Sequence, residues 1–257
     1  MKTMTTLFLS AQYQSALSRH QFDDFESIWA SEIKWFEEPN QRRGGWSGVG
    51  RIELSHDHVN FLNVFVKKQQ NHGRLTWRHP IKGEPTFRRE FQRLKFLESH
   101  HFAAPKVLFY GESGVGGNQR AILVTVALDD FQSFEDVLNG WWVRASRQQQ
   151  NRLIKKIALE LRRFHDLGLV HRALYPKHIF VKNVDQNPEV ALIDLEKARF
   201  SFFGAYRTFF DLAALNRHSE KLRASQRLAF FMRYLGTEKL GWFNKLLCRL
   251  IVKRSSR

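Results

Sequence analysis

The spacing of apolar residues separates helical stretches of the chain from extended ones. Apolar positions recur every three or four residues over 20–36, 85–97 and 149–165, which is typical of amphipathic helices with one buried face. Two later segments, 227–235 and 241–253, share this spacing and are basic. The pattern therefore predicts helices in both halves of the chain, with a basic pair at the end.

Extended stretches concentrate in the first half. Runs of β-branched and aromatic residues predict strands over 59–67, 104–111 and 120–128. The last run is almost wholly apolar, as expected of a strand at the centre of a sheet. Asp129 and Asp130 interrupt this run, so we expect the first part of the chain to end there.

A glycine-rich stretch, 39–50, precedes the first of these strands and contains Gly44, Gly45 and Gly48. Glycines between two strands allow backbone N–H groups to close over phosphates, because no Cβ stands in the way. The match to G-x-G-x-x-G is imperfect, and an ordinary hairpin turn has the same composition. Phosphate binding by these glycines is thus one of two readings.

Lys67 ends the strand 59–67 in a setting similar to V-A-I-K, where a strand lysine reaches nucleotide phosphates and a helix glutamate holds it. In the helix 85–97, Glu90 lies beside the apolar stripe and can face this lysine. Lys68 is an equal candidate, and a solvated lysine or a surface glutamate would look the same alone. The order and spacing of the two residues favour a phosphate-binding pair.

A dense group of candidate catalytic residues lies in the second half. His171, Arg172 and Ala173 stand where kinases have H-R-D, His178 follows, and Asp194 ends an apolar strand. In such loops the first Asp accepts the substrate's hydroxyl proton, and the later, strand-borne Asp holds Mg²⁺. The metal-binding Asp is present here, and alanine replaces the proton-accepting one.

Composition and charge narrow the class of protein. The 257 residues are 43% hydrophobic and 26% charged, as in an ordinary globular protein, and the lone Cys248 excludes an intrachain disulfide. The net charge is +16, and residues 217–257 alone contribute +9, which indicates attraction to polyanions. His56 and His58 have the spacing of a metal pair, but no third ligand is evident, so we predict no transition-metal site.

These motifs together resemble the lipopolysaccharide kinase (Kdo/WaaP) family, particularly its InaA-like branch. The resemblance extends over roughly residues 40–217. It is carried by the segments 65–72, 79–90, 174–181 and 192–199. Members are similar in having His where protein kinases have the loop Asn, so His178 fits the family, whereas Ala173 departs from its H-R-D form.

The resemblance implies an α+β, protein-kinase-like fold of two lobes. The N-lobe, residues 1–128, would carry an antiparallel sheet, and the reduced helical C-lobe, residues 129–257, would carry the catalytic loop. It further implies transfer of phosphate from ATP, with Mg²⁺, to a Kdo or heptose hydroxyl of the lipopolysaccharide inner core. The acceptor would be this core or another glycolipid.

The resemblance also assigns roles to residues. Lys67 would bind phosphate and Glu90 would orient it, with Gly44, Gly45 and Gly48 at the nucleotide. Asp194 would hold Mg²⁺, and His178 would bind the metal or hydrogen-bond to a phosphate oxygen; the hydrogen bond is favoured because Mg²⁺ prefers oxygen ligands. His171 and Arg172 would belong to the catalytic loop, whose backbone Asp211 would brace.

Alanine at position 173 leaves two functions open. A general base contributes on the order of 10²- to 10⁴-fold in rate, so nucleotide binding should survive its loss while turnover falls. Asp166 and Asp185 are the nearest acids in sequence, and a substrate phosphate is a third possible proton acceptor. The alternative is a nucleotide-binding pseudokinase with a regulatory or envelope-stress role.

The basic end of the chain has its own two readings. Lys245, Arg249 and Lys253 flank an apolar stripe in 241–253, which suits either a helix on an anionic bilayer or one packed on the second lobe. No apolar run reaches about 18 residues, so we expect a cytoplasmic protein, peripheral on the inner membrane if it touches lipid. No nucleic-acid-binding motif is present, which argues against that partner.

Overall fold

The computed structural model of the protein describes residues 4–36, 38–42, 44–55, 61–76, 79–115 and 118–256. The chain divides into two compact units, Met1–His100 with Pro105–Asp129 and His101–Ala104 with Asp130–Arg257. The boundary expected from the sequence lies between residues 128 and 129, and in the structure the chain passes from the first unit to the second between residues 129 and 130. His56 and His58 lie outside the described residues.

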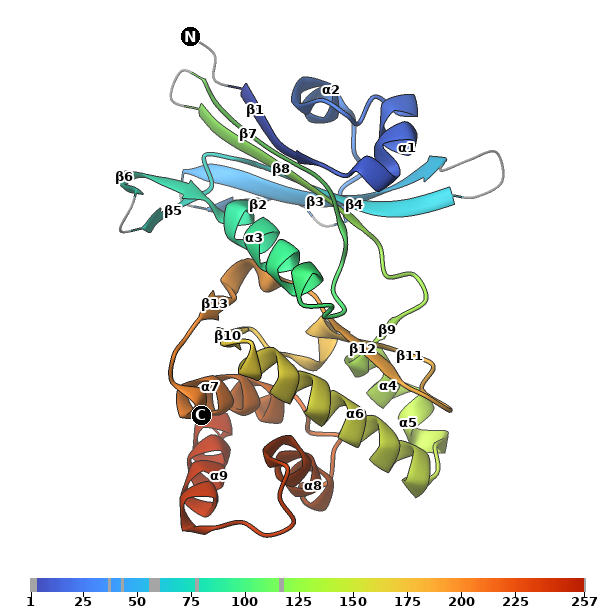
Figure 1. Cartoon of the computed structure of the whole chain (residues 1–257), viewed down its shortest axis with the longest axis vertical. Helices are drawn as coiled ribbons and strands as arrows, with labels where there is room; N and C mark the ends of the chain where they lie inside the picture. The colour runs from blue at the N-terminus through green and yellow to red at the C-terminus, as the bar shows by residue number, and fades with distance from the viewer. Residues whose placement is uncertain are drawn as a thin grey trace. The chain divides into compact units, whose positions relative to one another are not determined.

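The first unit is built on a six-stranded antiparallel sheet with the order β1-β7-β8-β4-β3-β2 (Figure 1). Its strands are β1 Met4–Leu9, β2 Asn40–Arg42, β3 Gly45–Ser55, β4 Phe61–Gln70, β7 Val107–Val115 and β8 Asn118–Val126. A separate strand pair, β5 Gly73–Thr76 and β6 His79–Pro85, leads into α3 Thr86–Ser99. The short helices are η1 Ala11–Tyr13, α1 Gln14–Arg19 and α2 Phe25–Ala30.

The two faces of this sheet carry different helices. Figure 1 shows α1 and α2 over one face and α3 over the other. Alternate residues of β4 point to opposite faces, as in any strand. Val64 and Val66 are fully buried in the core that includes Phe25 and Ile28 of α2. Lys67 therefore lies on the opposite side, where α3 runs.

The helix predicted over 20–36 is much shorter, and this prediction was wrong in extent. Asp24 caps α2 by accepting hydrogen bonds from the backbone N–H of Glu26 (2.9 Å) and Ser27 (3.0 Å). Ser31 then takes an extended conformation that ends the helix. After Ser31 the chain reaches β3, where Trp35 forms a bridge to Gly50.

The second unit consists mainly of helices around small sheets. Its helices are α4 Phe134–Asn139, α5 Trp141–Arg144, α6 Arg147–Asp166, α7 Gly204–Arg217, α8 Ala224–Leu235, α9 Trp242–Ser255, η2 Pro176–His178 and η3 Leu195–Lys197. Its strands are β9 Gln132–Ser133, β10 Leu169–Val170, β11 Ile179–Lys182, β12 Glu189–Leu192 and β13 Arg199–Phe200. Strands β12, β11 and β9 form one antiparallel sheet, and β10 pairs with β13.

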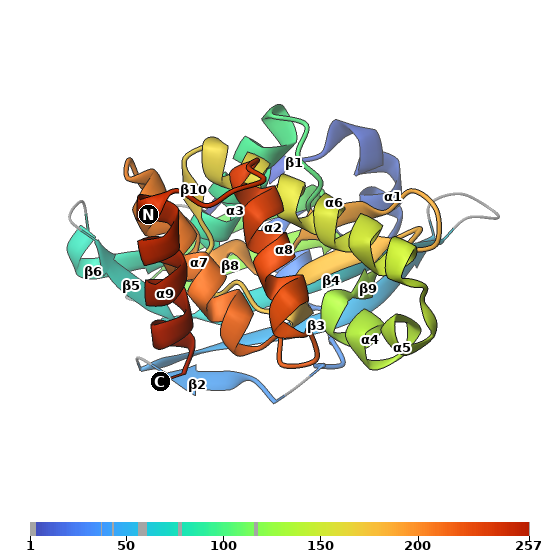
Figure 2. The same cartoon turned by 90° about the horizontal axis from the view of Figure 1, so that it is seen from below.

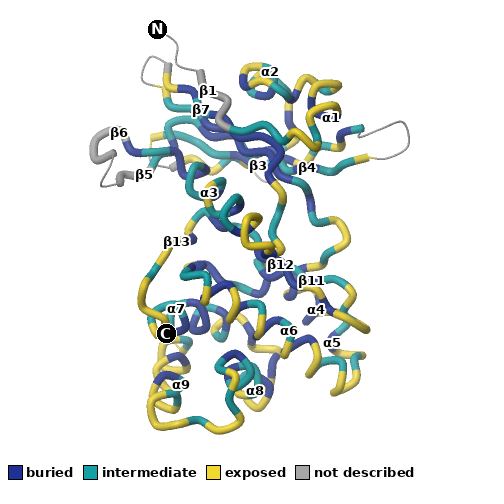
Figure 3. Tube along the Cα trace, viewed as in Figure 1, coloured by how far each residue is buried: buried dark blue, intermediate teal, exposed yellow. Residues whose placement is uncertain are grey.

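Helix α6 is the centre of the second unit. Ser146 and Gln149 form a capping box at its start, and its apolar stripe, which includes Leu153, Ile157 and Leu161, is almost fully buried (Figure 3). Helix α8 packs on α6 and α9 packs on α7 (Figures 1 and 2). None of the helices in the described part of the chain combines the length and the apolar character needed to cross a membrane.

Candidate functional site

The predicted lysine–glutamate pair is formed in the first unit. Lys67 Nζ on β4 donates to Glu90 Oε1 on α3 at 2.6 Å, and the two side chains are only 18% and 5% exposed. Gln69 fixes the start of α3 beside β4, because its Oε1 accepts from Thr86 Oγ1 (2.9 Å) and the Phe87 backbone N–H (3.1 Å). The strand and the helix are thus held in the register that brings the pair together.

Lys68 does not pair with Glu90. Its Nζ lies on the α2 face and donates to Ser31 O (2.7 Å), Trp29 O (3.0 Å) and Ser31 Oγ (3.2 Å). These acceptors account for the three N–H donors of the ammonium group. Burial lowers the pKa of Lys68 to about 8. Of the two candidate lysines, Lys67 is therefore the one that pairs with Glu90.

The glycine-rich stretch is a hairpin with a structural reason for most of its glycines. Gly44 lies in the turn between β2 and β3 at a φ of +74°, which other residues rarely adopt. A Cβ on Gly45 would meet Gln70 O at 2.1 Å, and one on Gly48 would meet the Trp35 ring at 2.9 Å. Gly45 and Gly48 thus permit close packing within the first unit, and nucleotide binding by these glycines stays a prediction.

In the second unit Asp211 holds the catalytic loop from beneath, as expected. This fully buried carboxylate accepts from the backbone N–H groups of His171 (2.6 Å) and Arg172 (2.8 Å). It also lies 3.0 Å from His165 Nε2, whose ring binds Tyr234 OH at 2.6 Å through Nδ1. Arg172 has a φ of +67°, so these hydrogen bonds support a backbone conformation that is unfavourable for arginine.

His178 and Asp194 meet beside this loop. His178 Nε2 lies 3.5 Å from Asp194 Oδ2, with side chains 12% and 37% exposed. His178 Nδ1 is 2.7 Å from Ala173 O, and His171 Nε2 is 2.9 Å from Ile193 O. Asp194 has a φ of +57°, which turns the chain sharply after β12. The loop and Asp194, the predicted metal ligand, are therefore linked through the two histidines.

The hydrogen bonds define the tautomer of His178. A carbonyl oxygen only accepts, so Nδ1 must carry the proton that it donates to Ala173 O. Burial lowers the pKa of His178, which favours the neutral ring. Nε2 is then an acceptor that faces a carboxylate, itself an acceptor. Two acceptors that converge in this way need a cation or a donor between them.

This donor set fits Mg²⁺ in a specific way. Mg²⁺ prefers oxygen ligands and keeps several of its waters. Asp194 would supply the oxygen, and His178 Nε2 would accept a hydrogen bond from a metal-bound water. In this tautomer His178 cannot donate to a phosphate oxygen, so the metal role suits it better. The described residues contain no cluster of three or more His, Cys, Asp or Glu side chains able to hold a metal.

Comparison with known proteins identifies the family and supports the fold. The model of the lipopolysaccharide kinase (Kdo/WaaP) family matches residues 26–234. The chain belongs to this family. Protein InaA of Escherichia coli (strain K12) is 34% identical over 184 residues, which are 70% of this chain and 80% of that protein. A solved structure described as WaaP in complex with acyl carrier protein covers 98% of both chains, with a TM-score of 0.69 and 20% identity, and supports the two-lobed kinase-like fold.

In this member of the Kdo/WaaP family, the two acids that the sequence suggested as substitutes for the missing base make other contacts. Ala173 is 1% exposed, and its carbonyl also accepts from the Tyr175 N–H at 2.9 Å. Asp166 pairs with Arg162 Nε at 2.9 Å at the end of α6. Asp185 accepts from Trp141 Nε1 at 2.7 Å in the β11–β12 connection. The structure thus places both acids named from the sequence in other contacts.

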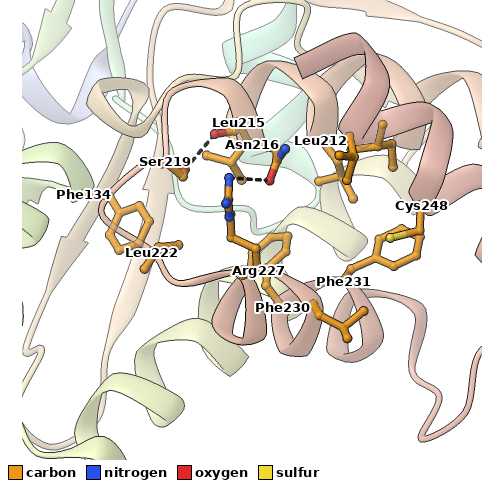
Figure 4. A pocket seen from close by; sticks show the side chains of 14 residues that line it. Phe134, Leu212, Leu215, Asn216, Ser219, Leu222, Arg227, Phe230, Phe231 and Cys248 are labelled. Atoms are coloured by element: carbon orange, nitrogen blue, oxygen red, sulfur yellow. Dashed lines mark hydrogen bonds between the residues drawn. The ribbon is translucent and has the colours of Figure 1, made fainter. Parts of the chain in front are cut away.

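The kinase-like site is separate from an apolar pocket of the second unit, with a volume of about 230 Å³ (Figure 4). Leu212, Phe231 and Ile251 contribute to its lining, and Arg227 reaches Asn216 Oδ1 at 3.4 Å beside it. None of the motif residues lines this pocket. Its lining is mainly apolar, and its polar members are Asn216, Ser219, Arg227 and Cys248.

Sequence reasoning missed the residues that support the site. Gln69 and Thr86 fall within the family's motifs, but only the fold shows that they join β4 to α3. His165 and Tyr234 are 69 positions apart, and their pairing around Asp211 follows from the packing of α8 on α6. The clue available in the sequence was the polar character of His165 on an otherwise apolar helix stripe.

Proposed function

We propose that this protein transfers the γ-phosphate of ATP to a Kdo or heptose hydroxyl of the lipopolysaccharide inner core. The observation that carries the proposal is the Lys67–Glu90 ion pair between β4 and α3, in which the glutamate side chain is 5% and the lysine side chain 18% exposed. Family membership supports the acceptor class. The acceptor is a glycolipid, so we further propose peripheral contact with the anionic cytoplasmic face of the inner membrane.

Each motif residue receives a role in this proposal. Lys67 would neutralise nucleotide phosphate, with Glu90 holding its ammonium in place, and the turn at Gly44 would contribute backbone N–H donors. Asp194 would hold Mg²⁺ with His178 beside it, and the ion would neutralise charge on the transferred phosphoryl group. His171 and Arg172 would position the loop through Asp211.

The proton of the acceptor hydroxyl must leave without an Asp at position 173. Phosphoryl transfer depends mainly on positioning and charge neutralisation, so the reaction remains feasible at a reduced rate. We propose that a phosphate oxygen of the substrates accepts the proton. The products are then ADP and the phosphorylated sugar.

The experiment that tests this function measures labelled phosphate transfer from ATP to purified, dephosphorylated lipopolysaccharide core. The native protein should transfer phosphate, and Asp194→Ala should lower the rate at least about 10³-fold, because it removes the metal-binding carboxylate. Full activity of Asp194→Ala would contradict the proposal.

A second candidate function follows from Ala173. In it the protein is a pseudokinase that binds nucleotide and regulates an envelope stress response. Transfer by Ala173→Asp together with none by the native protein would favour this candidate. Measurable native transfer that Asp194→Ala abolishes would reject it.

A further inference from the structure

Helix α9 exposes one apolar side while it buries another. It packs on α7, where Ser255 Oγ donates to Ala213 O at 3.1 Å, and its buried residues are Leu247 and Ile251. Its other large apolar side chains face solvent, as the exposed stretches of α9 in Figure 3 illustrate. These are Trp242 (78% exposed), Phe243 (51%), Leu246 (46%), Leu250 (44%) and Val252 (52%).

Four of these five exposed apolar residues form one continuous surface, and Val252 lies away from it. At 3.6 residues per turn, Trp242, Phe243, Leu246 and Leu250 fall within an arc of about 100° around the helix axis. Leu247 and Ile251 lie next to this arc on one side. The helix is thus apolar over a wider sector than its contact with α7 requires.

A basic row borders the other edge of the exposed arc. Lys245, Arg249 and Lys253 are spaced four residues apart, so they follow one line along α9. None of the three forms an ion pair with a carboxylate in the described structure. From Lys239 to Arg257 the chain has six Lys and Arg and no Asp or Glu. The surface of α9 therefore combines large apolar groups with uncompensated positive charge.

The combination of apolar groups and positive charge on α9 favours one class of binding partner. A second copy would place two surfaces with the same uncompensated positive charge against each other, and like charges oppose such an interface. A nucleic acid would match the charge but leave Trp242 and its apolar neighbours against a polar backbone. An anionic bilayer satisfies both, because the apolar groups enter the headgroup boundary while the cations meet lipid phosphates.

We infer that α9 binds the surface of anionic phospholipid bilayers, with Trp242, Phe243, Leu246 and Leu250 inserted and Lys245, Arg249 and Lys253 at the headgroups. The helix lies outside residues 26–234, the stretch matched by the family model, and therefore outside the kinase motifs. The inference deepens the proposed function, since a glycolipid acceptor resides in such a bilayer, but its test needs neither ATP nor acceptor.

The test is flotation of the full chain with vesicles of phosphatidylcholine, alone or mixed with phosphatidylglycerol, at low and high salt. We expect binding to the mixed vesicles that weakens with salt. Replacing Lys245, Arg249 and Lys253 with Gln should weaken it about 100-fold, since each cation near an anionic surface contributes about fivefold. Trp242→Ser with Phe243→Ser should weaken it at least about tenfold.

Matched controls come from the same unit. Arg144, Arg147 and Lys155 are exposed and lie outside α9, so changing all three to Gln removes equal charge and should leave binding unchanged. Val143 on α5 is 79% exposed, and Val143→Ser should likewise have no effect. Thermal unfolding of each variant separates lost binding from lost folding.

A spectroscopic readout fixes the orientation of α9. Vesicles should shift the tryptophan emission of the native protein to the blue, and Trp242→Phe should retain binding while losing most of that shift. The inference is overturned if mixed vesicles do not bind the native protein, or if the control charge variant loses as much affinity as the α9 variant. It is equally overturned if light scattering shows self-association that Trp242→Ser and Phe243→Ser abolish while vesicle binding persists.

Discussion

The two units of this protein differ in how completely they retain kinase chemistry. In the first, Lys67 and Glu90 form the predicted ion pair at 2.6 Å, supported by Gln69. In the second, His178 and Asp194 meet over an anchored loop, but Ala173 replaces the expected base. In the proposed function, residues of the first unit bind phosphate while the proton passes to a substrate oxygen, so nucleotide affinity and turnover should respond to different substitutions.

The largest expected effect concerns the anchoring of the catalytic loop. Asp211→Asn replaces one acceptor oxygen with an N–H₂ group that faces backbone N–H donors, so we expect about 3 kcal/mol of destabilisation. Urea unfolding measures the loss, and amide exchange at His171 and Arg172 locates it. Asp185→Asn, which changes an exposed carboxylate, serves as the control and should change stability by under about 0.5 kcal/mol. If both substitutions lowered the free energy of unfolding equally, Asp211 would not have the predicted role of bracing the loop.

The next effect separates the adjacent lysines. Lys67→Met should lower ATP affinity about 100-fold, since it removes a charge-assisted contact with phosphate and leaves Glu90 without its partner. Lys68→Met should leave ATP affinity unchanged and reduce stability, because Lys68 binds backbone carbonyls on the α2 face. Calorimetric titration with ATP and Mg²⁺ measures the affinities. A similar loss of ATP affinity in both variants would contradict the prediction that Lys67 binds phosphate and Lys68 does not.

A smaller effect concerns the metal. His178→Ala should raise the Mg²⁺ concentration needed for half-maximal ATP binding about tenfold, which is the usual loss when a group around a metal site is removed. His218→Ala, an exposed histidine of the same unit, is the matched control. If Mg²⁺ dependence is unaltered by His178→Ala, this histidine does not support the ion.

The smallest expected effect is a pH dependence from Lys68. The pKa of Lys68 is lowered to about 8 in the folded protein, so between about pH 8 and pH 10.5 the unfolded chain binds more protons. Raising pH over this range should therefore stabilise the native protein relative to Lys68→Met by about 1 to 2 kcal/mol, after allowance for solvent screening. Urea unfolding of both proteins along a pH series measures the difference, and a constant difference would contradict the low pKa.

The sequence predicted the pairing of Lys67 with Glu90 but mispredicted part of the local fold, and the roles of the site residues stay predictions. Lys67, Glu90, His178 and Asp194 were assigned because each residue type follows a strand or a helix face at the spacing that kinase chemistry requires. The helix over 20–36 was overextended because the apolar pattern continues through Ile33 and Trp35, which pack as extended chain where Gly48 and Gly50 leave room. That packing depends on long-range contacts, which periodicity does not show.

The pairing of strand β1 is another long-range contact that the sequence pattern did not predict. It pairs with β7, more than 100 residues later, and nothing in its short apolar run predicts that partner. The polar network of His165, Asp211 and Tyr234 was also hidden, because its members come from three different helices. By contrast, the predicted helix over 149–165 matches α6 closely, since its buried stripe is continuous and its cap is local.

The most direct test of this account compares the native protein with Ala173→Asp in ATP affinity and in phosphate transfer to lipopolysaccharide core, with thermal unfolding as the control for folding. The account predicts equal ATP affinity, because Lys67 and Glu90 are untouched, and a rise in transfer of about 10²-fold or more, because a proton acceptor is restored. Unchanged transfer by a folded Ala173→Asp variant would contradict the claim that the missing base limits this kinase.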